Sequence, residues 1–173
     1  TVTLGAKAAA SGLATITMAD ALAADDITVG AAFTSDLTVN LSADGGTNVV
    51  DATGYTKALT VSGKISTMDT SAPTITGGSG TSDSLVIRID ETDDVVLTGL
   101  SAVEQITVTD ASAAANHTTA VTLNNANATY TSAAIYETLT VDATAIGASG
   151  DTVNINATAE LDAKVILKGG DGV

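Results

Sequence analysis

The chain has 173 residues, enough for one sizeable domain, and carries 20 Asp and Glu against 6 Lys and Arg, a formal net charge of −14. This charge would repel the phosphates of nucleic acids and anionic lipids, so nucleic acid and membrane insertion are excluded from the expected interactions. Cysteine is absent and no run of about 18 or more apolar residues occurs, which excludes disulfides, thiolate metal sites and a membrane-spanning helix.

The first part of the chain gives a mixed signal. "TVTL" (1–4) alternates Thr and apolar side chains, as strands do. Residues 6–24 are rich in Ala, whose propensity favours a helix. Within them, however, "TITM" (15–18) has the alternation of a strand, and Gly12 interrupts a helix. Helix and irregular strand therefore stay equally open for residues 6–24.

From residue 26 onward a short strand motif returns along the chain. Each copy has three to six residues that alternate aliphatic with Thr or Asn side chains and is closed by Gly, Asn or Asp, which indicates a strand followed by a turn. In chain order the copies are "DITVG" (26–30), "DLTVN" (36–40), "ALTVSG" (58–63), "PTITGG" (73–78), "SLVIRID" (84–90), "DVVLTGL" (94–100), "QITVTD" (105–110), "AVTLN" (120–124), "TLTVD" (138–142), "TVNIN" (152–156) and "KVILKGG" (164–170).

The spacing of these motifs fits two folds. Their first apolar residues are 10 to 18 residues apart, with one gap of 22 between Leu37 and Leu59, so no single period fits. A β-solenoid gives such spacings when each coil contains two or three short strands joined by turns of variable length. A β-sandwich spaces its strands by about 8 to 12 residues, so spacing alone leaves both folds open.

The composition favours the solenoid. Trp is absent and the chain has one Phe and three Tyr, at positions 33, 55, 130 and 136. Because Ala, Val, Leu and Ile cannot fill a wide interior, the core must be thin. We therefore predict an all-β fold of stacked short strands, a parallel β-solenoid, with a β-sandwich as the alternative.

The alternation also predicts which side chains face the core. In each repeated triplet of Leu or Ile, Thr and Val, the first and third residues face inward and the Thr faces outward, where stacked Thr side chains form a ladder at the ~4.8 Å strand spacing. The expected inward residues are Ile27, Val29, Leu37, Val39, Leu59, Val61, Ile106, Val108, Leu139 and Val141. The expected outward residues are Thr28, Thr38, Thr60, Thr107 and Thr140.

Two features interrupt the strand pattern. "ASAAANHTTAV" (111–121) fits a turn excursion from a coil. Pro73 cannot donate a hydrogen bond into a central sheet, so a seam between two stacks is predicted near residues 64–80. Apart from this seam, residues 1–173 are expected to form one β-rich structural domain.

The C-terminal part, "LTVDATAIGASGDTVNINATAELDAKVILKGGDGV" (139–173), resembles segments next to the calcium-binding RTX repeats of large type I secreted bacterial proteins, including surface-layer (S-layer) proteins and adhesins. In that family a strand followed by "DA", a "GDT" stretch and a "GGxGxD" opening occur in this order. The matching positions are Val141, Asp142, Ala143, Gly150, Asp151, Val153, Gly169, Gly170 and Gly172.

The resemblance implies an extracellular, calcium-rich setting at the cell surface, secretion by the type I route, and a structural or adhesive role. It also implies that the chain is a fragment of a longer one, with an RTX-like repeat beginning at residues 169–173. The chain departs from the family pattern because the sixth repeat position falls beyond Val173 and no second G-G-x-G-x-D repeat is present. A calcium roll needs stacked repeats, so this stretch alone cannot build one.

The densest acidic stretch is "RIDETDDVVL" (88–97), which holds Asp90, Glu91, Asp93 and Asp94 between two predicted strands. Calcium takes 6 to 8 oxygen ligands, so an oxygen-rich turn is a candidate site for it. The alternative is a solvated turn, in which Asp is favoured because it bonds to its own backbone.

Other carboxylates stand singly at predicted turns, where stacking would bring some of them together. Like charges at short distance destabilise one another unless a cation intervenes, which is the physical argument for Ca²⁺ as a cofactor. Besides the acidic stretch, the predicted metal ligands are Asp25, Asp26, Asp142, Asp151 and Asp171. Taken singly, each of these five is better explained as a turn former than as a ligand, and so are the turn carboxylates Asp44, Asp83 and Asp110.

Catalysis finds little support in the sequence. His117 is the single histidine, without a Ser or Asp spacing that suggests a triad. The Gly-rich stretches at 77–80 and 168–172 lack the ending of a phosphate-binding loop. The lack of Trp argues against a sugar-stacking cleft, although paired carboxylates can meet in space from distant positions. We therefore predict that the chain is not an enzyme.

The leading hypothesis is a structural module of a secreted bacterial surface-layer protein, stabilised by calcium and assembling with copies of itself into a lattice or filament. A cell-surface polysaccharide is a further candidate partner. The alternative is an adhesin segment that binds a receptor, a glycan or a surface. An ice-binding Thr face is a weaker alternative, because "TVT" and "TIT" recur only irregularly.

Overall fold

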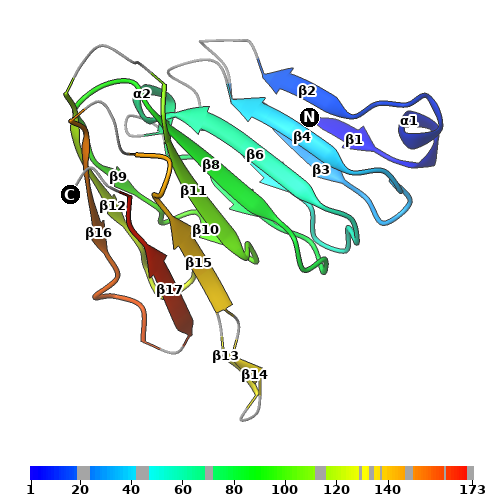
Figure 1. Cartoon of the computed structure of the whole chain (residues 1–173). Helices are drawn as coiled ribbons and strands as arrows, with labels where there is room; N and C mark the ends of the chain where they lie inside the picture. Colours follow the sequence, from blue (N-terminus) through cyan, green and yellow to red (C-terminus); the bar gives the residue numbers. More distant parts are fainter. Residues whose placement is uncertain are drawn as a thin grey trace.

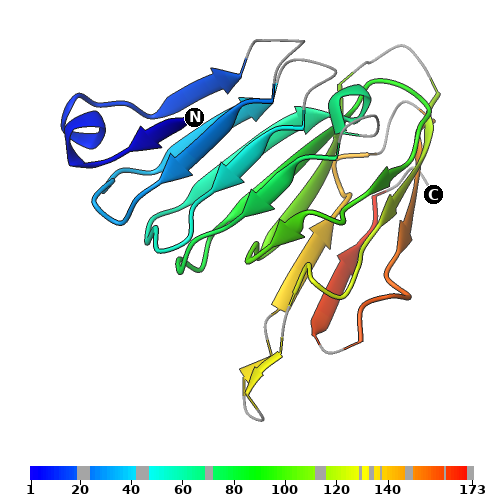
Figure 2. The same ribbon diagram turned by 180° about the vertical axis from the view of Figure 1, so that it is seen from behind.

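A computed structural model of the chain describes residues 1–18, 24–41, 47–68, 72–111, 116–128, 130–132, 135–136, 138–146, 150–161 and 163–170 (Figures 1 and 2). The fold is all-β with 6% helix, and its parallel strands stack into a β-solenoid of about 6 turns. The predicted parallel β-solenoid is therefore confirmed over the β-sandwich.

Three parallel sheets make up the solenoid (Figure 1). Sheet A contains β1 (Val2–Leu4), β3 (Asp26–Val29), β5 (Val49–Asp51), β7 (Thr74–Thr76) and β10 (Leu100–Ser101). Sheet B contains β2 (Thr15–Met18), β4 (Leu37–Leu41), β6 (Leu59–Lys64), β8 (Ser84–Ile89), β11 (Gln105–Asp110), β15 (Thr138–Asp142) and β17 (Lys164–Lys168). Sheet C contains β9 (Val95–Val96), β12 (Thr118–Thr122) and β16 (Thr152–Asn156).

The chain visits these sheets in turn. The first three coils consist of a strand of sheet A followed by one of sheet B. The fourth and fifth coils, β7 to β9 and β10 to β12, add a strand of sheet C. After β12 the described strands belong to sheets B and C, apart from a hairpin. Sheet B thus runs along the whole solenoid, while sheet A gives way to sheet C.

The remaining elements lie outside the three sheets. The antiparallel hairpin of β13 (Tyr130–Ser132) and β14 (Ile135–Tyr136) leaves the stack between β12 and β15 and projects beyond the sheets in both views (Figures 1 and 2). Helix α1 (Ala6–Ala10) connects β1 to β2, and α2 (Ile65–Met68) follows β6. Neither helix is long and apolar enough to cross a membrane, and the described residues contain no other helix that could.

The strand register gives the coil length, which the spacing of the strand motifs in the sequence did not show. Ile27 lies opposite Val50, Val50 opposite Ile75, and Ile75 opposite Leu100, so these coils are offset by 23, 25 and 25 residues. One coil is longer: Ile106 lies opposite Val141, 35 residues on, because the hairpin is inserted there. Single strand motifs showed no period because each coil contributes strands to two or three sheets.

The core is a narrow column of aliphatic side chains between the sheets. All ten residues predicted to face inward are buried, with exposed fractions of 3% or less. The five Thr predicted to face outward are half-buried on the outer faces. Each fully buried Val, Leu or Ile contributes about 1.5–3 kcal/mol by leaving water. The predicted inward and outward faces are therefore confirmed.

Two aromatic residues fill the corner between sheets A and B. Phe33 and Tyr55 follow β3 and β5, and their ring centroids lie 6.0 Å apart on neighbouring coils. The Tyr55 hydroxyl donates a hydrogen bond to the Ser35 carbonyl. Burial raises the pKa of Tyr55 to about 12, and the charges of Asp36 and Asp83 act in the same direction. The fold therefore holds the neutral phenol.

Three stretches differ from the simplest reading of the sequence. Both alternatives for residues 6–24 are correct in part, since α1 is followed by β2, while residues 19–23 lie outside the described residues. Strand β12 begins at Thr118, within the turn excursion expected at 111–121, and residues 112–115 lie outside the described residues. Strand β5 was not predicted, because its residues "VVD" do not alternate apolar with polar side chains.

The stretch at 64–80, where a seam was predicted, contains α2 and β7. Strands of sheets A and B on either side of this stretch pair with each other. Val61 lies opposite Leu85 in sheet B, and Val50 lies opposite Ile75 in sheet A. The separation of the chain into two stacks at this point stays a prediction.

We expect Leu85→Ala to lower the free energy of unfolding by about 2–5 kcal/mol, because it opens a cavity in a core that neighbouring coils cannot close. Leu85 is fully buried in the middle of sheet B. Val86→Ala is the matched control, since Val86 is the next residue of the same strand and faces outward. Urea unfolding measures both. Equal losses for the two variants would contradict the assigned faces.

Candidate functional site

The first predicted calcium ligand, Asp90, is occupied by contacts with the preceding coil. Its carboxylate lies 3.0 Å from Lys64 Nζ, and it accepts hydrogen bonds from the Ser66 hydroxyl at 2.9 Å and the Ser66 backbone N–H at 3.3 Å. Burial pushes the pKa of Asp90 upward, but the hydrogen bonds from Lys64 and Ser66 together outweigh it and lower the pKa below its ordinary value. Asp90 therefore links β8 to the start of α2 in the coil before it.

The rest of the acidic turn, between β8 and β9, is exposed. Asp93 accepts a hydrogen bond from the backbone N–H of Asp94 at 2.7 Å. Asp94 accepts one from the backbone N–H of Ala120, on the next coil, at 2.8 Å. Glu91 is also exposed. The contact of Asp93 is the local bond of the solvated turn former that the sequence left open as an alternative, whereas Asp94 bonds across to the next coil.

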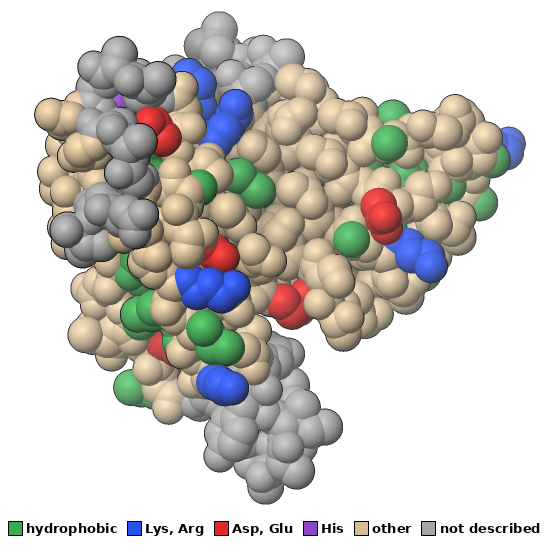
Figure 3. Space-filling view, in the orientation of Figure 1, with side chains coloured by type: hydrophobic (Ala, Val, Ile, Leu, Met, Phe, Trp, Pro, Cys, Tyr) green, Lys and Arg blue, Asp and Glu red, His purple; other side chains and the backbone are tan. Residues whose placement is uncertain are grey.

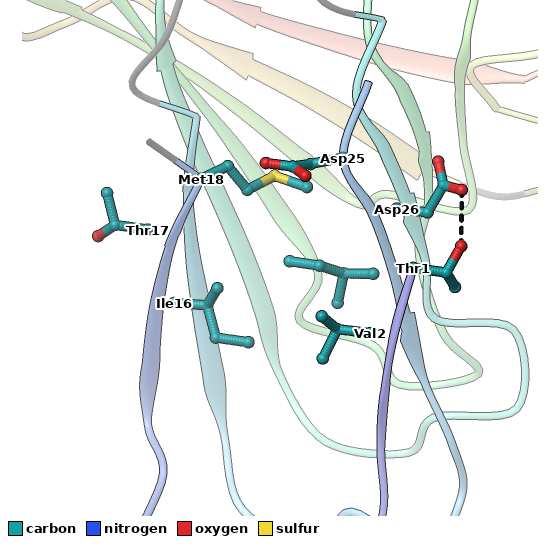
Figure 4. A pocket seen from close by; sticks show the side chains of 8 residues that line it. Thr1, Val2, Ile16, Thr17, Met18, Asp25 and Asp26 are labelled. Carbon is teal, nitrogen blue, oxygen red and sulfur yellow. Dashed lines mark hydrogen bonds between the residues drawn. The ribbon is translucent and has the colours of Figure 1, made fainter. Parts of the chain in front are cut away.

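Asp25 and Asp26 lie at the N-terminal end of the solenoid. Together with Val2, Ile16 and Met18 they line a cavity of about 150 Å³ between β1 and β2 (Figure 4). The Asp26 carboxylate accepts a hydrogen bond from the Thr1 hydroxyl at 2.9 Å, drawn as a dashed line in Figure 4. The cavity therefore has mixed walls, in which Ile27 joins the apolar side chains and Thr1 and Thr17 join the two carboxylates.

Asp142 belongs to a turn motif that the sequence repeats. It accepts hydrogen bonds from the Thr144 hydroxyl at 2.6 Å and the Thr144 backbone N–H at 3.0 Å, and Lys168 Nζ lies 3.3 Å away. The bonds from Thr144 and, more weakly, from Lys168 lower its pKa. "DAT" at 51–53 and "NAT" at 156–158 make the same bond from the Thr backbone to the Asp or Asn side chain. An Asp or Asn two residues before Thr therefore marks the corner after a strand.

Asp151 is buried against the single histidine. Its carboxylate accepts a hydrogen bond from the His117 backbone N–H at 2.6 Å, and His117 Nδ1 lies 3.4 Å from the same oxygen. The Thr152 backbone N–H donates to the His117 carbonyl at 2.7 Å. The two residues thus join the beginnings of β12 and β16, on neighbouring coils. No sequence pattern connects these two residues, since they are 34 residues apart.

The predicted ligands do not converge on one centre in the described part of the chain. Among those residues, no group of three or more His, Cys, Asp or Glu side chains is placed to hold a metal ion. Asp171 lies outside the described residues, as do 172 and 173 of the RTX-like stretch. Calcium binding by these carboxylates stays a prediction.

Asp83 has a structural role, although the sequence predicted it only as a turn former. Its fully buried carboxylate accepts hydrogen bonds from the backbone N–H groups of Leu59 at 2.8 Å and Gly78 at 2.6 Å, and its own N–H donates to Glu104 at 2.8 Å. A Cβ at Gly78 would lie 2.2 Å from the Tyr55 carbonyl, so this corner requires glycine. Leu59 and Asp83 are 24 residues apart, so their contact is recognised only when neighbouring coils are aligned.

We expect Asp90→Asn to lower the free energy of unfolding by about 1–2 kcal/mol at neutral pH, because it removes the charge that Lys64 and Ser66 hold. The pKa of Asp90 is lower in the folded protein, so its contribution is present above the unfolded-state pKa of about 3.9 and is lost as the pH falls. The difference between wild type and variant should therefore shrink below about pH 4.

Urea unfolding across a pH series measures this difference. Asp93→Asn is the matched control, since Asp93 is exposed and bonds to its own neighbour. A difference for Asp90→Asn that stays constant down to acidic pH would contradict the assigned role of its charge.

Comparisons with known proteins assign no family to the chain. No protein-family model matches it. No curated protein and no solved structure matches it significantly either. The function is therefore inferred from the chain's own residues and from the way in which the solenoid places them.

Proposed function

We propose that this chain is a structural module of a secreted bacterial surface-layer protein that works outside the cell, is stabilised by calcium and assembles with copies of itself. The observation that carries the proposal is sheet B, in which seven parallel strands form one ladder along the solenoid. Such a ladder with a buried aliphatic core makes a stiff rod, which suits a lattice or filament. Type I secretion and the surface location rest on the resemblance of residues 139–173 to segments beside RTX repeats.

A structural role also agrees with the small size of the cavity at the N-terminal end. At about 150 Å³ it is smaller than the roughly 300–1,000 Å³ of typical small-molecule sites. The buried polar side chains Asp83, Asp151 and Asn127 hold backbone groups of their own or neighbouring coils. These groups serve the fold, so the proposal includes no catalytic step.

Charge supports the part of the proposal that concerns calcium. A formal net charge of −14 on a narrow rod is destabilising by self-repulsion. In the acidic turn, Glu91, Asp93 and Asp94 are exposed within four residues, and one bond to a backbone N–H leaves a carboxylate further lone pairs for a cation. Calcium accepts such a mixture of carboxylates, carbonyls and water.

We expect millimolar calcium to raise the Tm by about 5–10 °C relative to excess EGTA, the size of effect that saturation of a moderate site gives. Circular dichroism measures the Tm, and light scattering follows the particle size. Magnesium and sodium chloride at equal ionic strength are the ion controls. The triple variant Glu91→Gln, Asp93→Asn, Asp94→Asn should lose most of the rise.

The matched control is Asp36→Asn, Asp51→Asn, Asp110→Asn, which removes the same charge elsewhere and should keep the calcium effect. If sodium chloride reproduces the rise, screening alone stabilises the solenoid. If calcium changes neither Tm nor particle size, the proposed calcium-dependent assembly is wrong.

The projecting hairpin favours the second candidate, an adhesin segment that binds a receptor, a glycan or a surface polysaccharide. It lengthens one coil to 35 residues, and its strands place Tyr130 opposite Tyr136. Loop insertions from a rigid scaffold are common binding sites. If this function is correct, replacing residues 129–137 by a short turn should abolish binding to intact cells or purified surface polysaccharide. The Tm should change little. Unchanged binding would count against the adhesin reading.

A further inference from the structure

We propose that copies of this chain pack side by side, with the outer face of sheet B of one copy against the outer face of sheet A of the next. This inference rests on the proposed function, since it names the surfaces through which the module assembles. The partner is a second copy of the same chain. The two surfaces differ, so the contact is heterologous and extends into an open array of solenoids.

Positive charge gathers on the outer face of sheet B. The chain has six Lys and Arg residues, and four of them occupy outward positions of this sheet, alternating with inward ones. Within the seven strands, all of which the structure describes, the outward positions hold one carboxylate, Asp142. On the face shown in Figure 3, blue Lys and Arg side chains lie over sheet B amid mainly tan backbone and uncharged polar side chains. The four cationic residues are Lys64, Arg88, Lys164 and Lys168.

Two of these cations stand directly opposite each other. Lys64 pairs with Arg88 in the register of β6 and β8, and like charges at such positions destabilise a sheet. Asp90 lies 3.0 Å from Lys64 Nζ and offsets one of the two charges. Arg88 forms no ion pair with a described residue, and its buried Nε has no hydrogen-bond partner among them. Sheet B therefore presents a positive charge that its own described surroundings do not compensate.

The outer face of sheet A has the opposite character, and it lies on the far side of the core from sheet B (Figures 1 and 2). Asp26 and Asp51 occupy outward positions on its neighbouring strands β3 and β5. The strands of sheet A, all of them described, contain no Lys or Arg. The backbone and side-chain hydrogen bonds from Thr53 lower the pKa of Asp51, so this carboxylate is charged at neutral pH. The two faces are therefore complementary in charge.

The net negative charge of the chain does not prevent this contact. At physiological ionic strength, exposed charges more than about 8 Å apart are largely screened, so the charges within the contact decide whether two surfaces attract. Two sheet B faces, or two sheet A faces, would bring like charges together, which is unfavourable. Charge therefore selects the unlike pair of faces.

Short hydroxyl side chains let the two faces approach closely. On the outer face of sheet B, Thr38 lies opposite Thr60, and on that of sheet A, Thr3 lies opposite Thr28. Each hydroxyl donates one hydrogen bond and accepts others, so facing rows of Thr pair without a fixed partner. The contact is therefore polar and weak for a single pair of copies, and an array multiplies it because each copy uses both faces.

The test uses the full chain and two charge-reversed variants. The sheet B variant, Arg88→Glu with Lys164→Glu, removes the positive excess of the outer face of sheet B. The sheet A variant, Asp26→Lys with Asp51→Lys, makes the outer face of sheet A basic. Each should weaken self-association by roughly ten-fold or more, because attractive pairs become repulsive. Sedimentation over a concentration series with calcium present measures association, and electron microscopy shows the arrays.

Net charge is controlled in both directions. Lys7→Glu with Lys57→Glu is the matched control for the sheet B variant, since Lys7 lies in α1 and Lys57 between β5 and β6. It changes the net charge equally and should associate like the wild type. The sheet A variant makes the chain less negative, so it would associate more strongly than the wild type if net repulsion alone governed association.

Combining the four substitutions in one chain gives the sharper result. Its faces are complementary again with the signs exchanged, so the combined variant should recover association, as should a mixture of the two separate variants. Circular dichroism checks that each variant folds. If Arg88→Glu is unfolded, the single exchange of Lys164→Glu with Asp51→Lys tests the same faces, with the same recovery expected. A folded combined variant that stays monomeric would contradict the pairing.

Each alternative outcome has a distinct meaning. A wild-type chain that stays monomeric with and without calcium would overturn the proposed assembly itself. Association that persists unchanged in either charge-reversed variant would overturn this pair of faces and leave an assembling module with another contact. Binding to alginate, an acidic polysaccharide, that is lost in the sheet B variant while self-association is retained would assign the outer face of sheet B to a glycan, contrary to this inference.

Discussion

The whole molecule depends on one spacing, the ~4.8 Å between hydrogen-bonded parallel strands. Each coil stacks on the previous one at this distance. Equivalent residues of successive coils therefore form a column, and each side chain must pack against the ones directly above and below it. Inside, the column from Ile16 to Leu167 contains only Ile, Val and Leu. At the corners, where backbones meet, Gly78 has no room for a Cβ. A small, repetitive amino-acid composition is a direct consequence of this constraint.

The same constraint explains why buried acidic side chains are compatible with an aliphatic core. Asp83 and Asp151, which are buried, and Asp94, which is exposed, each accept a hydrogen bond from a backbone N–H of an adjacent coil. Each of these N–H groups lies one position before pairing with the neighbouring coil's strand begins, so the donor would otherwise need another acceptor. A carboxylate supplies that acceptor with a strong bond. Acidic residues therefore tie coils together at the corners, as the ladder does in the strands.

Much of the fold was predictable from local pattern. The triplets around Thr28, Thr38 and Thr60 gave both the strands and their buried faces, because alternation is decided within a few residues. Strand β5 was missed because its three residues show no alternation, and the coil length was missed because register between coils depends on turns whose geometry no local pattern records. The candidate sites show the same limit. The sequence placed Asp90 and Asp142 at turns but could not show that Lys64 and Lys168 stand beside them.

The change from sheet A to sheet C has a mechanical consequence. In the fourth and fifth coils all three sheets are present, so force applied along the solenoid axis is shared by three ladders of hydrogen bonds. Toward either end only two ladders carry it, sheets A and B at one end and sheets B and C at the other. A pulled solenoid would thus peel from its ends, coil by coil, while its centre stayed intact.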